Sequence, residues 1–507
     1  MKKLVLAIVT GAAVVAAALI PSGPPSEAAS PGFASAVSSV RQTSWQTNNS
    51  VNALAIAGDT VYAGGLFTRI RQPGKPAGQG ESVRTYIAAF NRKTGAPTSF
   101  APKLNGPVYS IATSPDGKWV VIGGDFTTVN GLSRHKLAMF NVATGKIVIG
   151  WDPKFSARVK ALAIYGNSVY VGGAFGRVDG TTRNRLAAVS VSQGVLQAWN
   201  PNADDDVYAV DVSDNGQRVF VGGPFEKING KDHYSLAMVN TTTGAAYSMP
   251  AAAAIPEPSP TCTTRVKDID TLGNKVFVSN GGDGYGCYDG VLAADATTGK
   301  LLWQNNCLGA TEAIKAIGNW VYKGSHAHDC SDSGAFGDDT GTHYLLVENA
   351  ANGNLGPWFP NTDANPNSTT QVGPLAMAGT STDLWVGGDF LHVNGKVQQG
   401  LTRFTNAPGG AAPAAPKAPK VTSTALNKAT VKFTDTYDLD NLTLTYNVFR
   451  GSTNIGSYKY TSYYWEPRKT YTVTDTGVKS GQTVSYHIEV NDGRSIVKGP
   501  AVSVKVR

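Results

Sequence analysis

The sequence predicts an all-β protein, and three observations support this fold class. The chain has 57 glycines and few runs rich in Leu, Glu and Lys, a composition that favours strands and turns over helices. A strand-like motif returns seven times, at intervals of about fifty residues. Each interval reads as four short strands, which is typical of one blade of a β-propeller. The sequence therefore predicts a seven-bladed β-propeller with four-stranded blades.

The repeated motif is an apolar strand that ends in Gly-Gly-x-Phe. Complete copies begin at Val61, Val120, Val169, Val219 and Leu384, and degenerate copies begin at Val276 and Val321. Tight turns such as "KTG", "ATG" and "TTG" follow in most repeats, where glycine supplies the positive φ that such a turn needs. We expect each copy of the motif to be the second strand of a blade.

The two ends of the repeat region predict how the ring closes. The last repeat has no recognisable fourth strand, and the segment "QTSWQTN", Gln42–Asn48, has no strands before it. We expect this N-terminal segment to complete the seventh blade, because that pairing removes the open edge between the first and last repeats. The predicted propeller spans residues 38–406.

Three further regions flank the propeller. Residues 1–28 have the pattern of a secretory signal peptide, with Lys2 and Lys3 before the apolar run Leu4–Ile20 and small residues near the cleavage site. Residues 407–420, "APGGAAPAAPKAPK", form a Pro/Ala/Gly linker. Residues 421–507 hold short alternating strands at the spacing of a β-sandwich. We expect a protein that is secreted, extracellular or associated with the cell wall, without a membrane span once the signal is removed.

Both folded regions resemble known families. The stretches "GGDFTTVNG" (Gly123–Gly131), "RHKLAMF" and "WNPNADDDVYAV" resemble the delta-60-type repeat of secreted bacterial β-propellers, over about residues 40–406. Residues 421–507 resemble a fibronectin type III domain, with Tyr486 as the corner tyrosine and Phe433 where such domains often carry Trp. The resemblance implies the fold and secretion, but a fold does not imply an activity.

The four cysteines are predicted to form two disulfides. Cys262 and Cys307 precede first strands, whereas Cys287 and Cys330 follow second strands, and these positions meet at one end of a blade. An even number of cysteines in a secreted chain favours disulfides, here Cys262–Cys287 and Cys307–Cys330. The alternative, a metal cluster, lacks a CxxC pair.

The segment Lys323–Tyr344 concentrates residues that can bind metals. His326 and His328 alternate just after a strand, so their imidazoles would share a face and could bind a transition metal. Four aspartates could instead supply oxygen ligands to Ca²⁺, namely Asp329, Asp332, Asp338 and Asp339. The segment matches neither HExxH nor an EF-hand, and the alternative is a disulfide-held loop whose side chains bond to turns. No cofactor is certain.

A second candidate is "GGDGYGCYDG", Gly281–Gly290, whose tyrosines and aspartates suit a sugar ligand. The alternative is another glycine-rich loop held by a disulfide. Both candidates lie among the long insertions, which all emerge at one end of the blades; we call this end the long-loop face. The predicted ligand-binding residues are His326, His328, Asp329, Asp338, Asp339, Asp283, Tyr285 and Tyr288.

Two functions from different classes remain. The first is a secreted, non-enzymatic binding or scaffold protein that recognises an extracellular glycan, a cell-wall polymer or a surface protein through the long-loop face. The second is an extracellular hydrolase or lyase that acts on polysaccharide. No catalytic residue is identified, because no acid/base pair, GxSxG motif or phosphate-binding loop can be read. The net charge of +8 includes no dense basic stripe, which argues against nucleic acid. We expect a monomer.

Overall fold

The computed structural model describes residues 37–284, 287–338, 341–367, 372–406 and 410–507. Within these ranges the prediction of an all-β protein is confirmed: the chain forms many small antiparallel sheets and two short 3-10 helices, Pro250–Ala254 and Ser331–Ser333. No helix in the described ranges is long and apolar enough to cross a membrane. The predicted signal peptide, residues 1–28, and positions 407–409 of the predicted linker lie outside them.

Seven successive sheets occupy residues 51–405, and we number them as repeats 1 to 7. Their first strands are β3 (Val51–Ala57), β8 (Val108–Thr113), β13 (Val159–Tyr165), β18 (Ala209–Val212), β24 (Cys262–Leu272), β28 (Thr311–Ile317) and β31 (Gly373–Gly379). Their second strands are β4 (Thr60–Gly65), β9 (Trp119–Gly124), β14 (Ser168–Gly173), β19 (Arg218–Gly222), β25 (Lys275–Gly284), β29 (Trp320–Ala327) and β32 (Asp383–Asp389). Their third strands are β7 (Ile87–Asn91), β12 (Leu137–Asn141), β17 (Leu186–Ser190), β22 (Leu236–Asn240), β26 (Gly290–Asp295), β30 (His343–Asn349) and β35 (Leu401–Thr405). In every repeat the second strand pairs with both others.

The fourth position of each repeat is less regular than the first three. Repeats 4 and 5 have a fourth strand, β23 (Ala246–Tyr247) and β27 (Leu301–Asn306), whereas repeats 1, 2, 3 and 6 have an isolated bridge there, such as Phe90 with Pro97. In repeat 7 the fourth strand is β1 (Arg41–Gln42), in which Arg41 pairs with Phe404. Of the predicted segment Gln42–Asn48, only Gln42 pairs with the last repeat, together with Arg41. Its second strand, Gln46–Thr47, pairs with Arg71 and Ile70 of repeat 1 instead.

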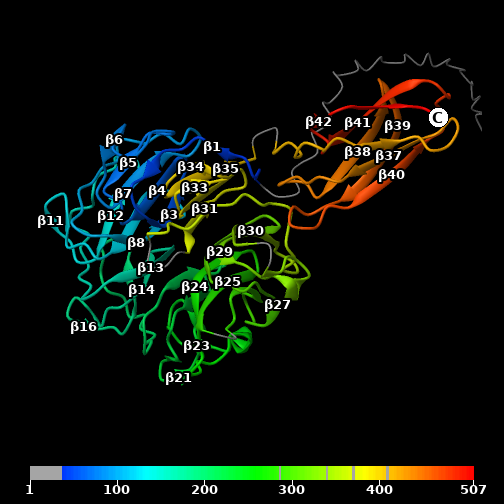
Figure 1. Ribbon diagram of the computed structural model, residues 1–507. Helices are drawn as coiled ribbons and strands as arrows, with labels where there is room; N and C mark the ends of the chain where they lie inside the picture. The colour runs from blue at the N-terminus through cyan, green and yellow to red at the C-terminus, as the bar shows by residue number, and fades with distance from the viewer. Residues whose placement is uncertain (1–36, 285–286, 339–340, 368–371, 407–409) are drawn as a thin grey trace, which may run out of the picture. The chain divides into compact units, whose positions relative to one another are not determined.

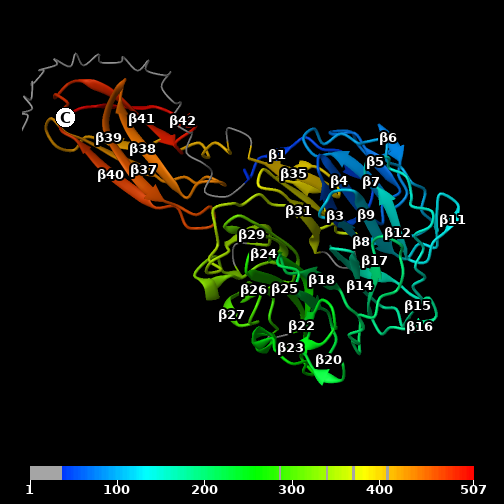
Figure 2. The same ribbon diagram turned by 180° about the vertical axis from the view of Figure 1, so that it is seen from behind.

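The first strands of neighbouring repeats contact one another along the whole series, and β31 of repeat 7 also contacts β3 of repeat 1. Figures 1 and 2 show β3 and β31 side by side in both views. A Cβ added at Gly387 of repeat 7 would lie 2.5 Å from Val51 Cγ1 of repeat 1. Among the described sheets none closes on itself, so this contact between the two ends is made by packing.

Close packing between repeats explains the Gly-Gly-x-Phe motif. A Cβ at Gly64 would lie 2.4 Å from Val108 Cγ1 of the next repeat, and one at Gly65 would lie 2.1 Å from the Ser50 carbonyl oxygen. Phe67, three residues after Gly64, is fully buried. The first glycine therefore lets one repeat approach the next, the second lets the chain pass close to the start of its own first strand, and the phenylalanine fills the core behind them.

Short hairpins follow the motif in five repeats. Four of them are β10–β11 (Thr128–Val129, Leu132–Ser133), β15–β16 (Arg177–Val178, Thr181–Thr182), β20–β21 (Lys227–Ile228, Lys231–Asp232) and β33–β34 (His392–Val393, Lys396–Val397). In repeat 1 the strand β5 (Arg69–Arg71) pairs with β6 (Glu81–Val83) on one side and with β2 (Gln46–Thr47) on the other. Asn130 and Gly131 have φ of 52° and 79°, as a type I′ turn requires.

Residues 420–505 form two antiparallel sheets. One contains β36 (Lys420–Thr422), β37 (Ala429–Thr434) and β40 (Thr470–Asp475). The other contains β39 (Thr453–Thr461), β38 (Thr443–Arg450), β41 (Thr483–Asn491), β42 (Ile496–Lys498) and β43 (Val502–Lys505). Phe433, Tyr446 and Tyr486 are buried between them, and the Tyr486 hydroxyl donates to Asp475.

Candidate functional site

A β-bulge in six of the first strands leaves one residue unpaired, and these six residues line a common cavity. In repeat 3, for example, the register shifts between Val159 and Ala161 and leaves Lys160 unpaired. The same irregularity occurs in repeats 1, 2, 5, 6 and 7, and Tyr208 holds the equivalent position just before β18. We call these seven the mouth residues: Asn52, Tyr109, Lys160, Tyr208, Lys267, Glu312 and Leu375.

All seven mouth residues line one cavity of about 170 Å³. It shares lining residues, including Leu54, Ile111 and Asp268, with a deeper cavity of about 430 Å³, so the two are parts of one channel between the first strands. Val51, beside the mouth residue Asn52, pairs with Gly65 at the end of β4, and the long loops and hairpins follow such strand ends. The mouth therefore opens at the long-loop face.

One lysine of the mouth and one neighbouring arginine lie over tyrosine rings. Lys160 Nζ lies 2.7 Å from the Asp206 carboxylate and 4.3 Å from the centre of the Tyr208 ring. Arg158 stands over Tyr109 in the same way, at 4.6 Å. These cation–π contacts fix the positions of the positive charges, while the lysine retains donors that its single carboxylate partner does not use.

The mouth of repeats 5 and 6 carries a second ionic cluster. Lys267 Nζ lies 2.8 Å from Glu312 Oε1, and both side chains are largely buried. Asp289 and His326 are their electrostatic neighbours. Burial raises the pKa of Asp289 and lowers the pKa of His326, because both groups lose water that would stabilise their charged forms.

Deeper in the channel, three aspartates and a lysine line the walls of repeats 4, 5 and 6. Asp270 accepts hydrogen bonds from Lys315 Nζ at 2.6 Å and from the Ala316 amide. Burial raises the pKa of Asp211 to about 7, and the Asp270 carboxylate adds to this increase. Burial likewise raises the pKa of Asp268 to about 7. The wall can therefore bind and release protons near neutral pH.

These charged residues replace alanines of the regular repeat. Asp211, Asp270 and Lys315 occupy the position that is alanine in the other four repeats. Asp268 occupies a position that is alanine in five repeats and Ser110 in repeat 2. Sequence reasoning missed this cluster. An alignment of the seven repeats would have shown that the charged residues of "DIDT" stand at positions where most repeats have alanine. No sequence signal marks which of these side chains share a cavity.

The two predicted disulfides are confirmed, with Cα–Cα distances of 5.4 Å for Cys262–Cys287 and 4.2 Å for Cys307–Cys330. A Cβ added at Gly282 would lie 2.3 Å from Cys287 Cβ, and Gly282 stands where regular repeats carry the buried phenylalanine of the motif. In repeat 6 Ala327 stands there and packs with Cys307 and Cys330. The disulfides thus fill the space of the missing phenylalanines.

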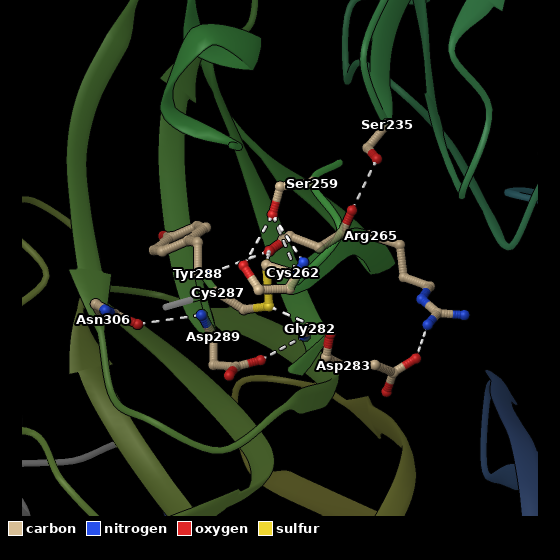
Figure 3. The surroundings of a disulfide bond; sticks show 12 residues. Ser235, Ser259, Cys262, Arg265, Gly282, Asp283, Cys287, Tyr288, Asp289 and Asn306 are labelled. Carbon is tan, nitrogen blue, oxygen red and sulfur yellow. Dashed lines mark hydrogen bonds and ion pairs between the residues drawn. A yellow bond between two sulfur atoms is a disulfide. The ribbon is translucent and has the colours of Figure 1, made fainter. Parts of the chain in front are cut away.

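Figure 3 shows how the predicted residues near the first disulfide lie. Asp283 points away from the sulfur atoms and pairs with Arg265, whereas Asp289 turns toward the Gly282 amide, at 2.5 Å. Tyr288 is buried on the other side, and its hydroxyl has no hydrogen-bond partner among the described residues. Tyr285 lies outside the described residues.

The other predicted residues lie in the loop of repeat 6. His328 Nδ1 lies 2.5 Å from Asp338 Oδ1, and both side chains are exposed. Asp329 accepts from the Ser331 amide at 2.9 Å, and Asp339 lies outside the described residues. Among the predicted loop residues, His326 has Lys267 and Glu312 of the mouth as electrostatic neighbours. Within the described ranges no three His, Cys, Asp or Glu side chains are grouped to hold a metal ion.

The same loop also contacts aromatic residues of the C-terminal region. Phe336 of this loop packs against Trp465 at a centroid distance of 5.4 Å. Phe359, in the link that follows β30, packs against the same ring at 4.8 Å. Tyr464 contacts His343 through its hydroxyl group. This part of the loop, beyond Cys330, therefore holds two regions of the chain together and is partly covered.

One family model matches the chain: a β-propeller domain of unknown function, DUF5122, over residues 114–141. The match covers the second strand, the hairpin and the third strand of repeat 2, including "GGDFTTVNG". No curated protein matches the chain significantly. The chain is thus an all-β protein that contains a stretch similar to a β-propeller domain.

Proposed function

We propose that the chain is a secreted, non-enzymatic binding protein that recognises an extracellular glycan or cell-wall polymer at the mouth of the channel. The seven repeats form the blades of a closed propeller of the delta-60 type, and residues 421–507 form a fibronectin type III-like module. The long loops of the disulfide-bonded blades stand around the mouth. The protein acts outside the cell or at the cell wall, as a monomer.

Closure of the ring is supported by three contacts between the ends of the repeat region. β1 pairs with β35, β3 contacts β31, and Gly387 packs against Val51. The convergence of one equivalent residue from each of the seven repeats on one cavity also favours a ring.

The proposed function rests on the composition of the mouth. It is a concave site that combines free polar groups, aromatic rings and a few charges, as sites for small polar ligands do. Asn52, Tyr109 and Tyr208 line it, and their side-chain polar groups make no hydrogen bond within the described part of the chain. These free groups match the hydroxyls of a sugar.

A glycan array tests the proposal, with binding quantified by calorimetry. We expect selected oligosaccharides to bind, and Tyr208→Ala to weaken that binding at least tenfold. Tyr165→Ala is the matched control, because Tyr165 lies at the opposite end of its first strand and is exposed. Absence of binding to every glycan tested would reject the proposal.

The carboxylates favour one alternative, a hydrolase or lyase that acts on polysaccharide. Glu312, paired with Lys267, and Asp268 line the same cavity, and the pKa of Asp268 is raised to about 7 by burial. Two carboxyl groups in different environments can serve as acid and base. A reducing-sugar assay separates the two functions, because a pure binding protein releases no new reducing ends.

A further inference from the structure

The charges at the mouth restrict the kind of sugar that fits it. Of the seven mouth residues three are ionic, Lys160, Lys267 and Glu312, and Asp268, whose pKa burial raises to about 7, lines the same cavity. The lining carries a net positive charge when Asp268 is protonated. Both lysines line the cavity, and their side chains are about one-fifth exposed. A neutral sugar needs no such excess, because hydroxyls are satisfied by neutral donors and acceptors.

The positive excess is larger on the side of repeats 2 to 4. Asp206 is shared by Lys160, at 2.7 Å, and by Arg185, at 3.3 Å. Asp125 is likewise shared by Arg158, at 2.5 Å, and by Lys136, at 3.5 Å. Two carboxylates thus pair with four cations around Tyr109 and Tyr208, so these groups together have an excess of positive charge.

Two nearby carboxylates do not cancel this excess in the cavity. Asp204 accepts from the Glu226 and Lys227 amides of the neighbouring hairpin, and Asp205 accepts from the Asp206 amide. Neither carboxylate lines the cavity, and of the four cations Lys160 alone is among the cavity's lining residues. Positive charge that is held in place beside aromatic rings and only partly neutralised is suited to an anionic group of a ligand.

We propose that the mouth binds a sugar unit that carries an anionic group, a carboxylate or a phosphate, and that Lys160 and Lys267 contact this group. This inference rests on the proposed function and specifies its ligand. Asn52, Tyr109 and Tyr208 bind the sugar hydroxyls. Glu312 keeps Lys267 in place and accepts a hydroxyl hydrogen bond with its second oxygen.

Calorimetry with matched probes tests the inference. The probes are trigalacturonate, the neutral galactotriose, a trisaccharide phosphate and inorganic phosphate. We expect the two acidic saccharides to bind at least tenfold more tightly than galactotriose, and inorganic phosphate to bind far more weakly than either. The ratio of trigalacturonate to trisaccharide phosphate affinity tells which anionic group the site prefers.

Variants distinguish specific binding at the mouth from general electrostatic attraction of an acidic saccharide to the protein surface. Lys160→Met with Lys267→Met keeps the apolar stems, and it should weaken trigalacturonate binding at least tenfold while changing galactotriose binding less than twofold. The control, Lys231→Met with Lys396→Met, removes the same charge from exposed hairpins of this face and should change neither more than twofold.

The outcomes distinguish the two proposals. If galactotriose binds as tightly as trigalacturonate, the proposed function stands and this inference is wrong. The inference is also wrong if both double variants lose the same affinity for the acidic saccharides. It is equally wrong if inorganic phosphate binds as tightly as those saccharides. If no saccharide binds, the proposed function fails and this inference fails with it.

Discussion

Two aspartates in the channel wall carry charge where the regular repeat has alanine. Asp211 accepts from the Thr271 amide of the next repeat, and Asp268 accepts from the Ile314 amide, at 2.8 Å and 3.0 Å. They therefore link neighbouring first strands. The lysine of this wall, Lys315, is already paired with Asp270, so these two carboxyls have no cation of their own.

Stability should accordingly fall as the pH rises. Asp has an unfolded pKa near 4, and burial raises the folded pKa of Asp211 and Asp268 to about 7. The protonated form is favoured by folding, so this stability is full below about pH 4 and is lost as the pH rises through about 7. The loss should be on the order of a few kcal/mol.

Urea unfolding between pH 4 and 8 measures this effect. Asp211→Ala with Asp268→Ala restores the residue of the regular repeat and should flatten the pH dependence. At pH 8 the double variant should be at least as stable as the parent chain. Parallel curves for the variant and the parent would show that other groups titrate.

Repeat 6 contains a buried ion pair whose removal should change the stability of the protein. Lys323 Nζ lies 2.5 Å from Glu348 Oε1, and neither side chain is exposed. Regular repeats carry apolar residues there, such as Val171 and Phe140. Removing one partner leaves an uncompensated charge, so Lys323→Val alone should cost about 3–5 kcal/mol. The double variant Lys323→Val with Glu348→Val should cost less than either single variant, as chemical denaturation can measure.

At the scale of elements, repeats 5 and 6 lack the hairpin and the motif phenylalanine and have disulfides instead. Sequence spacing was sufficient for the pairing of the cysteines, because each lies at a fixed position in its repeat. The bulges of the first strands could not be foreseen, since a bulge depends on pairing with the neighbouring strand rather than on one residue type.

Loss of the first disulfide should destabilise the protein. It closes a loop with a sequence separation of 25 residues, for which restriction of the unfolded chain is worth roughly 3 kcal/mol. Cys262→Ser with Cys287→Ser should lower the free energy of unfolding by about that amount, and it also leaves the space of the missing phenylalanine poorly filled. An unchanged melting temperature would mean that the disulfide constrains nothing.

For the whole molecule, the sequence was informative where the repeat is regular. The period, the strands and the site of the long insertions follow from "GGxF" and its spacing. The fourth strands were overestimated, because four repeats have only a bridge there. The mouth was missed because its residues, from Asn52 to Leu375, are unlike one another in type and share a site through their equivalent positions alone.

Closure makes a prediction about the N-terminal segment. β1 pairs with β35, and Ser38 donates to Asp440 in the C-terminal region. Deleting residues 38–48 should expose the edge of the last repeat and lower the melting temperature of the repeat region. Scanning calorimetry checks this, with the isolated residues 410–507 as the reference for the second transition. An unchanged transition would contradict closure by this segment.

In the proposed function, the ligand binds at the mouth of the channel, where equivalent residues of different repeats converge. The most direct test is the trigalacturonate dissociation constant of single alanine variants at Tyr109, Lys160, Tyr208 and Lys267, compared with His328→Ala and Asp329→Ala in the loop of repeat 6. We predict that each of the four mouth variants weakens binding at least fivefold and that the two loop variants change it less than twofold. If the loop variants abolish binding and the mouth variants leave it unchanged, the ligand binds at the loop, and the proposal that it binds at the mouth is wrong.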